Sequence, residues 1–322
     1  MPYRLARLIQ RLSFRQLQIF HTVYRKQSYS RAAEELNLTQ PAVSSQIRQL
    51  EQALGQPVFD YVGKKLYVTA AGEQLMRHVT ELFDNLNVLQ MELAVLQGQV
   101  RGQLRIAAVS TAQYVVPYLL KGFLDKFPQV DIQLKVINRA RALERLTQNQ
   151  DDLLIMGMVP DSNGINLLPF LDNLLVPVVR ANDPLLQQPI DTQTFLDAGL
   201  LIREQGSGTR HALEQWCREQ KLQLNPKMEM GSNDAIKHGV LADLGVAVLP
   251  KVSISSELQL GSLEILKLPG FPLRRSWSLV YPKGKHPTPV MQAFLNFVKT
   301  PLPQGMESIS SPSLIGTARS SF

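Results

Sequence analysis

Three short polar stretches in the middle of this chain have residue types and positions that could bind a small anion. Ser110-Thr111, Gly206–Arg210 and Ser232-Asn233 each follow a β-rich run and open a helical pattern. In open α/β sheets, ligands lie beyond the carboxyl ends of strands, against helix N-termini whose unpaired N–H groups favour negative charge. We therefore expect an anion-binding site at these junctions, although each one taken alone could be an ordinary cap or turn.

The predicted anion site combines hydroxyl, amide and guanidinium groups. Arg203 and Arg210 lie within or beside the second stretch, and Arg139 follows another β-rich run, so all three could supply full charges. The candidate binding residues are Ser110, Thr111, Arg139, Ser207, Gly208, Thr209, Arg210 and Asn233.

A second polar group, near the N-terminus, could bind a nucleic acid. Thr39, itself a candidate DNA contact, is placed to cap a helix with Pro41 in its first turn, where a missing N–H costs nothing. That helix turns Val43, Ile47 and Leu50 inward. Its other face exposes short polar groups and one arginine, which can reach base edges and phosphates in a major groove. The exposed set is Gln40, Ser44, Ser45, Arg48 and Gln49.

Basic residues and further caps flank this predicted recognition helix. Ser28 and Ser30 are both candidates to cap the preceding helix, and Ser30 is also a candidate DNA contact. Lys64 and Lys65 lie at the tip of a predicted hairpin and could touch phosphates as a wing.

Charge is concentrated in the same segment. Residues 1–69 carry ten lysines and arginines against four acids, a net +6, whereas the whole chain carries +7. A basic segment of this kind is typical of a protein with a polyanionic partner, although a merely solvated basic face is the alternative.

The sequence lacks the residues that several classes of function require. The single cysteine, Cys217, excludes an internal disulfide, and the five histidines form no close pair, so no metal is expected. There is no Walker motif and no nucleophile–base–acid constellation, so we expect no enzyme activity. No apolar run reaches membrane-spanning length, and the N-terminus has Arg4, Arg7 and Arg11 on an amphipathic extension rather than a secretory signal. These features predict a cytoplasmic protein without a membrane partner.

The elements that must position these residues form four regions. Residues 14–69 predict a winged helix-turn-helix, and residues 70–98 predict one long linker helix. Residues 102–299 alternate strands and helices in two α/β lobes, with a second unit from about residue 174 and a return to the first at 277–281. Residues 300–322 are rich in serine and proline and predict a disordered tail.

The long helix carries an apolar stripe at alternating spacings of four and three. Such a stripe is buried best against a partner helix, which predicts a dimerisation helix; packing on the chain's own domain is the alternative. The stripe is Leu75, Val79, Leu82, Leu86, Leu89, Leu93 and Leu96.

The run from Ser30 to Glu51, followed by Leu54-Gly55, resembles the LysR-type transcriptional regulators. The resemblance covers about residues 14–299. It implies DNA contacts at Gln40, Pro41, Ser44 and Ser45, a two-lobed effector domain similar to periplasmic solute-binding proteins, and a homotetramer built from dimers. Ser45 and Tyr61 stand where many family members carry arginine.

The second half is similar to the branch that controls carbon-fixation and inorganic-carbon uptake operons. This similarity rests on the runs 109–112, 138–139, 155–157, 203–210 and 230–237, and it adds Gly157 to the candidate effector residues. It implies a small anionic effector, such as ribulose bisphosphate, 2-phosphoglycolate or 2-oxoglutarate, and no cofactor. A solute receptor that does not act through double-stranded DNA is the alternative hypothesis, and an enzyme acting on a phosphorylated acid is the third.

Overall fold

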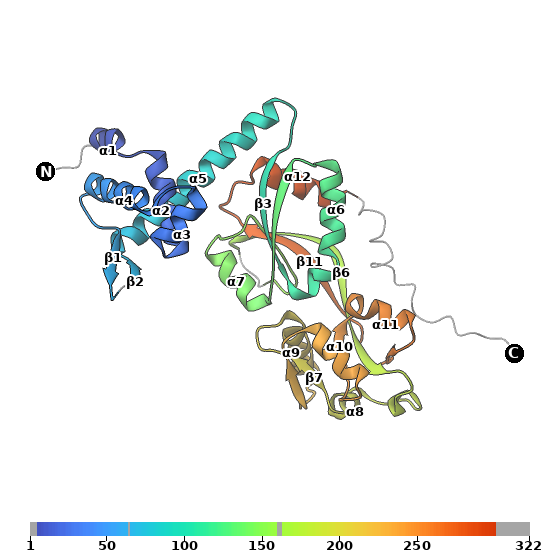
Figure 1. Cartoon of the computed structure of the whole chain (residues 1–322). Helices are drawn as coiled ribbons and strands as arrows, with labels where there is room; N and C mark the ends of the chain where they lie inside the picture. The colour runs from blue at the N-terminus through green and yellow to red at the C-terminus, as the bar shows by residue number, and fades with distance from the viewer. Residues whose placement is uncertain (1–4, 64, 160–162, 301–322) are drawn as a thin grey trace. The chain divides into compact units, whose positions relative to one another are not determined.

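The structure, a computed structural model, describes residues 5–63, 65–159 and 163–300, and the side chains from residue 8 onward (Figure 1). The chain forms two compact units, Met1–Gln90 and Met91–Phe322. The predicted tail lies outside the described residues except for Thr300. No helix within the described ranges is long and apolar enough to cross a bilayer.

The first unit is a winged helix-turn-helix, as its sequence predicts. Its elements in chain order are α1 (Leu5–Arg11), α2 (Phe14–Lys26), α3 (Tyr29–Leu36), α4 (Gln40–Leu54), β1 (Phe59–Val62), β2 (Lys65–Val68) and the start of α5 (Ala70–Leu96). Strands β1 and β2 pair antiparallel, with Phe59 opposite Val68. The side chains of Phe20, Val23 and Ile47 are buried in the core of this unit.

Side-chain caps fix where the helices begin. Ser28 caps α3 by accepting a hydrogen bond from the Arg31 N–H, and Thr39 caps α4 by accepting one from the Ala42 N–H. Ser30, the other cap candidate, instead lies exposed in the first turn of α3. Asn37 between α3 and α4 adopts a left-handed conformation with φ of 53°, which asparagine tolerates better than most residues.

The apolar stripe of α5 divides into two parts. Leu75, Val79 and Leu82 pack on the core of the helix-turn-helix. Farther along the helix, Leu86, Leu89, Leu93 and Leu96 are 39%, 49%, 50% and 83% exposed. The first half of the stripe therefore packs on the chain's own domain, and the second half presents an apolar face.

The second unit has two lobes. Lobe I contains β3 (Gly102–Val109), η1 (Ser110–Tyr114), α6 (Val116–Lys126), β4 (Val130–Ile137), α7 (Arg139–Thr147), β5 (Leu153–Met156) and α12 (Pro289–Val298). Strand β3 pairs in parallel with both β4 and β5. The lobe I core holds Phe123, Trp277 and Phe294.

Lobe II follows the same alternation of strands and helices. Its elements are η2 (Pro184–Leu186), α8 (Thr192–Asp197), β7 (Leu201–Arg203), α9 (Gly208–Gln220), β8 (Met228–Met230), α10 (Asn233–Leu241), β9 (Ala247–Pro250), η3 (Lys251–Ile254), α11 (Ser255–Gln259) and β10 (Leu263–Ile265). Two apolar clusters flank its strands, one containing Phe195 and Leu213 and the other Ile236 and Val240.

Two long antiparallel strands join the lobes. Strand β6 (Ile165–Arg180) and strand β11 (Leu273–Pro282) pair along most of their length, so the described strands of this unit form one sheet in the order β4-β3-β5-β11-β6-β9-β7-β8, with β10 on β6. On β6, Leu171 belongs to the lobe I core and Leu175 to the lobe II core. The residues between these two positions therefore lie at the hinge.

Candidate nucleic-acid interface and anion-binding cleft

The outer face of α4 presents the polar side chains predicted for a recognition helix. Gln40, Pro41, Ser45 and Arg48 are exposed, and Ser44 is half-buried. The opposite face buries Val43, Ile47 and Leu50. This burial fixes the rotation of the helix, so its polar face must point outward and is available to a partner.

The hairpin forms as predicted and adds polar and aromatic groups. Lys65 is exposed on β2 opposite Val62, whereas Lys64 lies outside the described residues. Tyr61 and Tyr67 are 68% and 50% exposed on the same hairpin. An exposed tyrosine can hydrogen-bond to a phosphate or stack, so these residues join the candidate surface.

Part of the basic charge is compensated within the unit. Arg25 and Lys26 at the end of α2 both pair with Glu35 on α3. The hydrogen bond from Lys26 lowers the pKa of Glu35, so this carboxylate stays charged at neutral pH. These two cations therefore tie α2 to α3, whereas Arg48 on α4 is directed to solvent.

A narrow cleft lies at the hinge between the two lobes. Its volume is about 20 Å³, close to the room that one water molecule needs. Helix N-termini, strand ends and both crossing strands contribute to it. The lining residues are Val109, Thr111, Arg139, Gly157, Met158, Asn173, Leu175, Gly208, Thr209, Ala212 and Arg275.

Buried polar atoms without partners gather in this cleft. Among the described residues, five buried side-chain atoms lack a hydrogen-bond partner, and three of them, Asn173 Oδ1, Thr209 Oγ1 and Arg275 Nε, belong to lining residues. Asn173 and Thr209 are only 7% and 4% exposed. Because leaving such an atom unpaired costs about 1–3 kcal/mol, their convergence on one cleft indicates a site that a polar ligand completes.

Several hydrogen bonds close the lobes around the cleft. The Ala140 N–H donates to Gly206 O at 3.1 Å, and Tyr114 OH donates to Asp234 Oδ1 at 3.2 Å. Gly206 has φ of +84°, and a Cβ there would lie 2.9 Å from the Ala140 Cβ, so the two lobes approach too closely for any larger residue.

Arg203 also bridges the lobes. It is 2% exposed and donates to Asn233 Oδ1 at 2.6 Å and to Ser110 Oγ at 3.3 Å. Glu204 accepts two further hydrogen bonds from the same guanidinium, at 2.7 and 2.9 Å. Its charge is therefore compensated within the protein, and its role in the closed form is to hold Ser110 and Asn233 beside each other.

The structure brings most of the predicted effector residues together. Thr111, Arg139, Gly157, Gly208 and Thr209 line the cleft. Thr111 Oγ1 accepts a hydrogen bond from Trp277 Nε1 at 3.2 Å, and Arg139 Nε donates to Met158 O at 2.9 Å. Burial lowers the pKa of Arg139. The pKa of an arginine nevertheless lies so far above neutral pH that the guanidinium keeps its charge.

Other predicted residues lie beside the cleft. Ser110 and Asn233 are held by Arg203, and Ser207 is a buried residue that precedes α9 without a capping side-chain hydrogen bond. Ser207 therefore leaves the first N–H groups of α9 available to a ligand.

The structure does not place Arg210 at the cleft. Its guanidinium pairs with Glu214 and Glu229, at 2.6 and 2.5 Å. The hydrogen bond to Glu214 raises the pKa of Arg210. Arg210 directly follows the lining residues Gly208 and Thr209, but its side chain reaches these two carboxylates instead of the cleft.

Two cleft residues were not found from the sequence. Asn173 and Arg275 face each other in register on the crossing strands β6 and β11. Neither lies at a strand–helix junction, which was the signal used to find the others. Only strand pairing across about a hundred residues brings them together.

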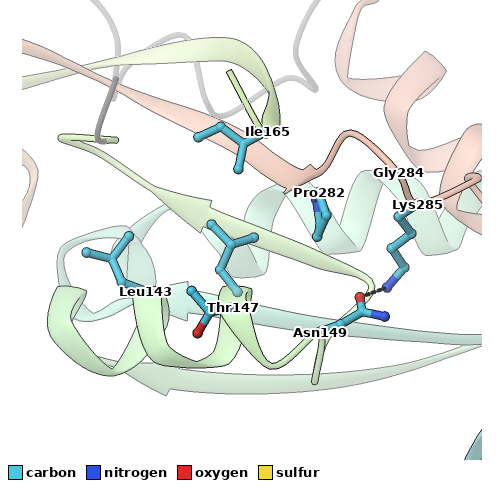
Figure 2. A pocket seen from close by; sticks show the side chains of 9 residues that line it. Leu143, Thr147, Asn149, Ile165, Pro282, Gly284 and Lys285 are labelled. Atoms are coloured by element: carbon cyan, nitrogen blue, oxygen red, sulfur yellow. Dashed lines mark hydrogen bonds between the residues drawn. The ribbon is translucent and has the colours of Figure 1, made fainter. Parts of the chain in front are cut away.

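Two larger cavities lack this polar character. One of about 680 Å³ lies in lobe I (Figure 2), lined by Leu143, Ile165 and Pro282 among others. Its cation, Lys285, donates to Asn149 Oδ1 at 3.1 Å and to Asp151 O at 2.7 Å. The other, of about 850 Å³, lies in lobe II and is lined mainly by apolar residues. Volume alone would favour these cavities as the anion-binding site. The unpaired buried polar atoms favour the cleft instead.

The chain matches two family descriptions. Residues 14–73 match "Bacterial regulatory helix-turn-helix protein, lysR family", and residues 97–302 match "LysR substrate binding domain". The chain is 43% identical over 305 residues to the RuBisCO operon transcriptional regulator of Acidithiobacillus ferrooxidans, covering 94% of this chain and 99% of that protein.

Solved structures share this fold. The regulatory domain of Synechocystis CcmR in complex with 2-PG is 32% identical, with a TM-score of 0.58 over 66% of this chain and 98% of that one. Full-length CbnR complexed with its target DNA is 19% identical, with a TM-score of 0.66 over 89% of this chain and 99% of that one, and it shows the shared fold. The chain, with its exposed recognition helix and its two-lobed domain, belongs to the LysR family of bacterial transcriptional regulators.

Proposed function

We propose that this regulator controls carbon-assimilation genes. A small anionic metabolite, bound in the cleft between the lobes, changes its affinity for promoter DNA. The observation that carries the effector proposal is the convergence of Asn173 Oδ1, Thr209 Oγ1 and Arg275 Nε, all buried and unpaired, on that cleft. The RuBisCO operon regulator and the 2-PG complex among its relatives support the choice of genes and of ligand class.

The chemistry of the cleft fits a compact anion. Arg139 and Arg275 bring positive charge, Thr209 brings a hydroxyl, and the N-terminus of α9 brings backbone N–H groups. Because the cleft is so narrow, a ligand enters only when the lobes part, and it then holds them together. Binding thereby shifts the population of lobe arrangements, which requires different affinities for the two states.

The one cysteine of this chain does not support a second possible function, the sensing of peroxide through a reactive thiol. Cys217 is 2% exposed, and burial raises the pKa of its thiol to about 11. The nucleophilic thiolate is therefore scarce at neutral pH, and the described structure offers no second cysteine to form a disulfide.

The test is a promoter-binding titration with the full-length protein. We measure fluorescence anisotropy of a carbon-fixation promoter fragment and of a shuffled duplex of equal length. Each titration is run without ligand and with 2-phosphoglycolate, ribulose bisphosphate, 2-oxoglutarate or inorganic phosphate. We expect a preference for the promoter fragment, changed by at least one organic anion and not by inorganic phosphate. A protein without promoter preference under every condition would refute the regulatory role and favour a solute receptor.

A charge variant tests the place of the effector. Asn173→Asp puts a carboxylate into the cleft and should abolish the anion response while leaving ligand-free DNA binding within about twofold. Asn182→Asp, which adds the same charge at an exposed position beyond the end of β6 and away from the cleft lining, is the matched control and should respond as the parent does. An undiminished anion response in Asn173→Asp would show that the effector binds elsewhere.

A further inference from the structure

The short helix α1 precedes the helix-turn-helix proper. It covers Leu5–Arg11, whereas the match to the family's DNA-binding region begins at residue 14. Ser13 then opens α2 with a reciprocal capping box shared with Gln16, so α1 and α2 are separate helices. Helix α1 is therefore an addition to the DNA-binding unit.

Helix α1 lies against the recognition helix. It contacts α4, and Leu12, which follows it, packs on the core of the first unit. Gln16 Nε2, just beyond, donates to Gln49 Oε1 on α4 at 3.3 Å. Figure 1 shows α1 next to α4 at the edge of this unit. These contacts fix α1 beside the helix whose outer face carries Arg48.

The charged residues of this N-terminal segment are all basic. Residues 1–24, which precede the pair Arg25 and Lys26 that Glu35 compensates, carry four arginines and no aspartate or glutamate. Arg11, at the end of α1, and Arg15, in the first turn of α2, are both exposed. A surface of this kind next to a recognition helix is complementary to the phosphates that flank a DNA site.

We propose that the end of α1 and the first turn of α2 form an additional DNA-contacting element, in which Arg11 and Arg15 bind backbone phosphates beside the segment read by α4. The partner is double-stranded DNA, contacted through its phosphates and without base reading. The proposal deepens the DNA-binding function and rests on it. An alternative occupant of this surface is a second copy of the chain, since Ile9 is 66% exposed.

The experiment compares the parent with a variant that loses only charge. Arg11→Gln and Arg15→Gln are combined in the full-length protein as the α1 variant, because glutamine keeps a helix propensity close to that of arginine and Leu12 is left in place. The control combines Lys135→Gln and Arg218→Gln, two exposed cations of the second unit, with the same loss of net charge. Affinity for promoter and random duplexes is measured across a salt series, and mass is measured by light scattering.

The two variants should differ in salt dependence. The α1 variant should bind both duplexes more weakly by the same factor, and its plot of log K against log[salt] should be shallower by about 0.9 to 1.8, or ~0.9 per lost phosphate contact. The control should keep the parent's slope. An unchanged slope in the α1 variant, an equal loss in the control, or a change in mass with the slope intact would overturn the proposal. A parent without promoter preference would instead contradict the DNA-binding function, a separate outcome.

Discussion

At the scale of single residues, the two candidate sites are built in different ways. The residues of α4 act through exposure, because one helix face is buried and the other is thereby presented. The residues of the cleft act through burial, because Asn173, Thr209 and Arg275 hold polar atoms that the protein itself leaves unpaired. Substitutions at the two sites should therefore have different effects on the stability of the free protein.

Arg48→Ala should weaken promoter binding with little change in folding. Arg48 is exposed on the outer face of α4, and losing a direct contact to a base or phosphate costs about 1–3 kcal/mol, or ~5- to 150-fold in affinity. Anisotropy titrations measure the loss, with Arg218→Ala on α9 as the control of equal charge. Promoter affinity equal to that of the parent would remove Arg48 from the DNA contacts.

Thr209→Val should have opposite effects on stability and on ligand binding. Replacing an unpaired buried hydroxyl by a methyl group of the same shape should leave the free energy of unfolding unchanged or raise it by up to about 1 kcal/mol. The same change removes a hydrogen bond to the effector and should raise its dissociation constant by about tenfold or more. Denaturant unfolding and calorimetry measure the two quantities.

Thr192→Val is the matched control for this change. Thr192 is also buried in lobe II, but its hydroxyl already donates to Pro269 O at 3.3 Å. This variant should lose stability, about 1 kcal/mol, and keep the parent's effector affinity. If Thr209→Val binds the effector as the parent does, its hydroxyl is not part of the site.

At the scale of elements, lobe closure depends on a few contacts between η1, α7 and the elements of lobe II. Tyr114 on η1 reaches Asp234 on α10, and the α7 backbone reaches the loop before α9. Burial raises the pKa of Tyr114, so its hydroxyl keeps its proton and remains a donor at neutral pH. These contacts stabilise the closed form only, because they join residues on opposite lobes.

Tyr114→Phe should weaken effector binding without touching the cleft lining. Removing the hydroxyl that donates to Asp234 destabilises the closed form by about 0.5–1.5 kcal/mol, which should raise the effector's dissociation constant roughly 2- to 10-fold. Calorimetry with 2-phosphoglycolate checks the shift. Tyr118→Phe, which alters an exposed tyrosine on α6, should bind as the parent does. Equal affinities in all three proteins would exclude this hydrogen bond from the closure equilibrium.

At the scale of the whole molecule, the exposed half of the α5 stripe points to self-association. Leu86, Leu89, Leu93 and Leu96 repeat along one face of α5 and are exposed in the single chain. An apolar stripe with this spacing is buried best against another helix. We propose that two copies of the chain pair through it, which would supply two recognition helices to one promoter.

Leu93→Lys should weaken that dimer. A charge placed in a helix–helix seam loses the apolar burial and must itself be desolvated, so the dimer dissociation constant should rise more than tenfold. Sedimentation velocity across a concentration series measures it. Gln90→Lys, an exposed position of α5 off the stripe, is the control. An unshifted dissociation constant for Leu93→Lys would place the interface on another surface.

The sequence by itself determined the elements and part of the site. Caps at Thr39 and Ser28, the helical spacing of Val43, Ile47 and Leu50, and polar groups at strand–helix junctions are local features, and local hydrogen bonding and burial enforce them. For this reason the winged helix-turn-helix, the two α/β lobes, and Thr111, Gly208 and Thr209 as cleft residues were predictable. The family resemblance supplied the role of these elements.

Only the tertiary structure decided which polar groups share the cleft. Asn173 meets Arg275 because β6 and β11 pair across the hinge, and Arg210 leaves the cleft because carboxylates on the outside of lobe II hold it. The leucine stripe of α5 is divided because half of it meets its own core. Spacing along a chain fixes the face a side chain occupies, but its partner depends on which distant segments the fold packs beside it.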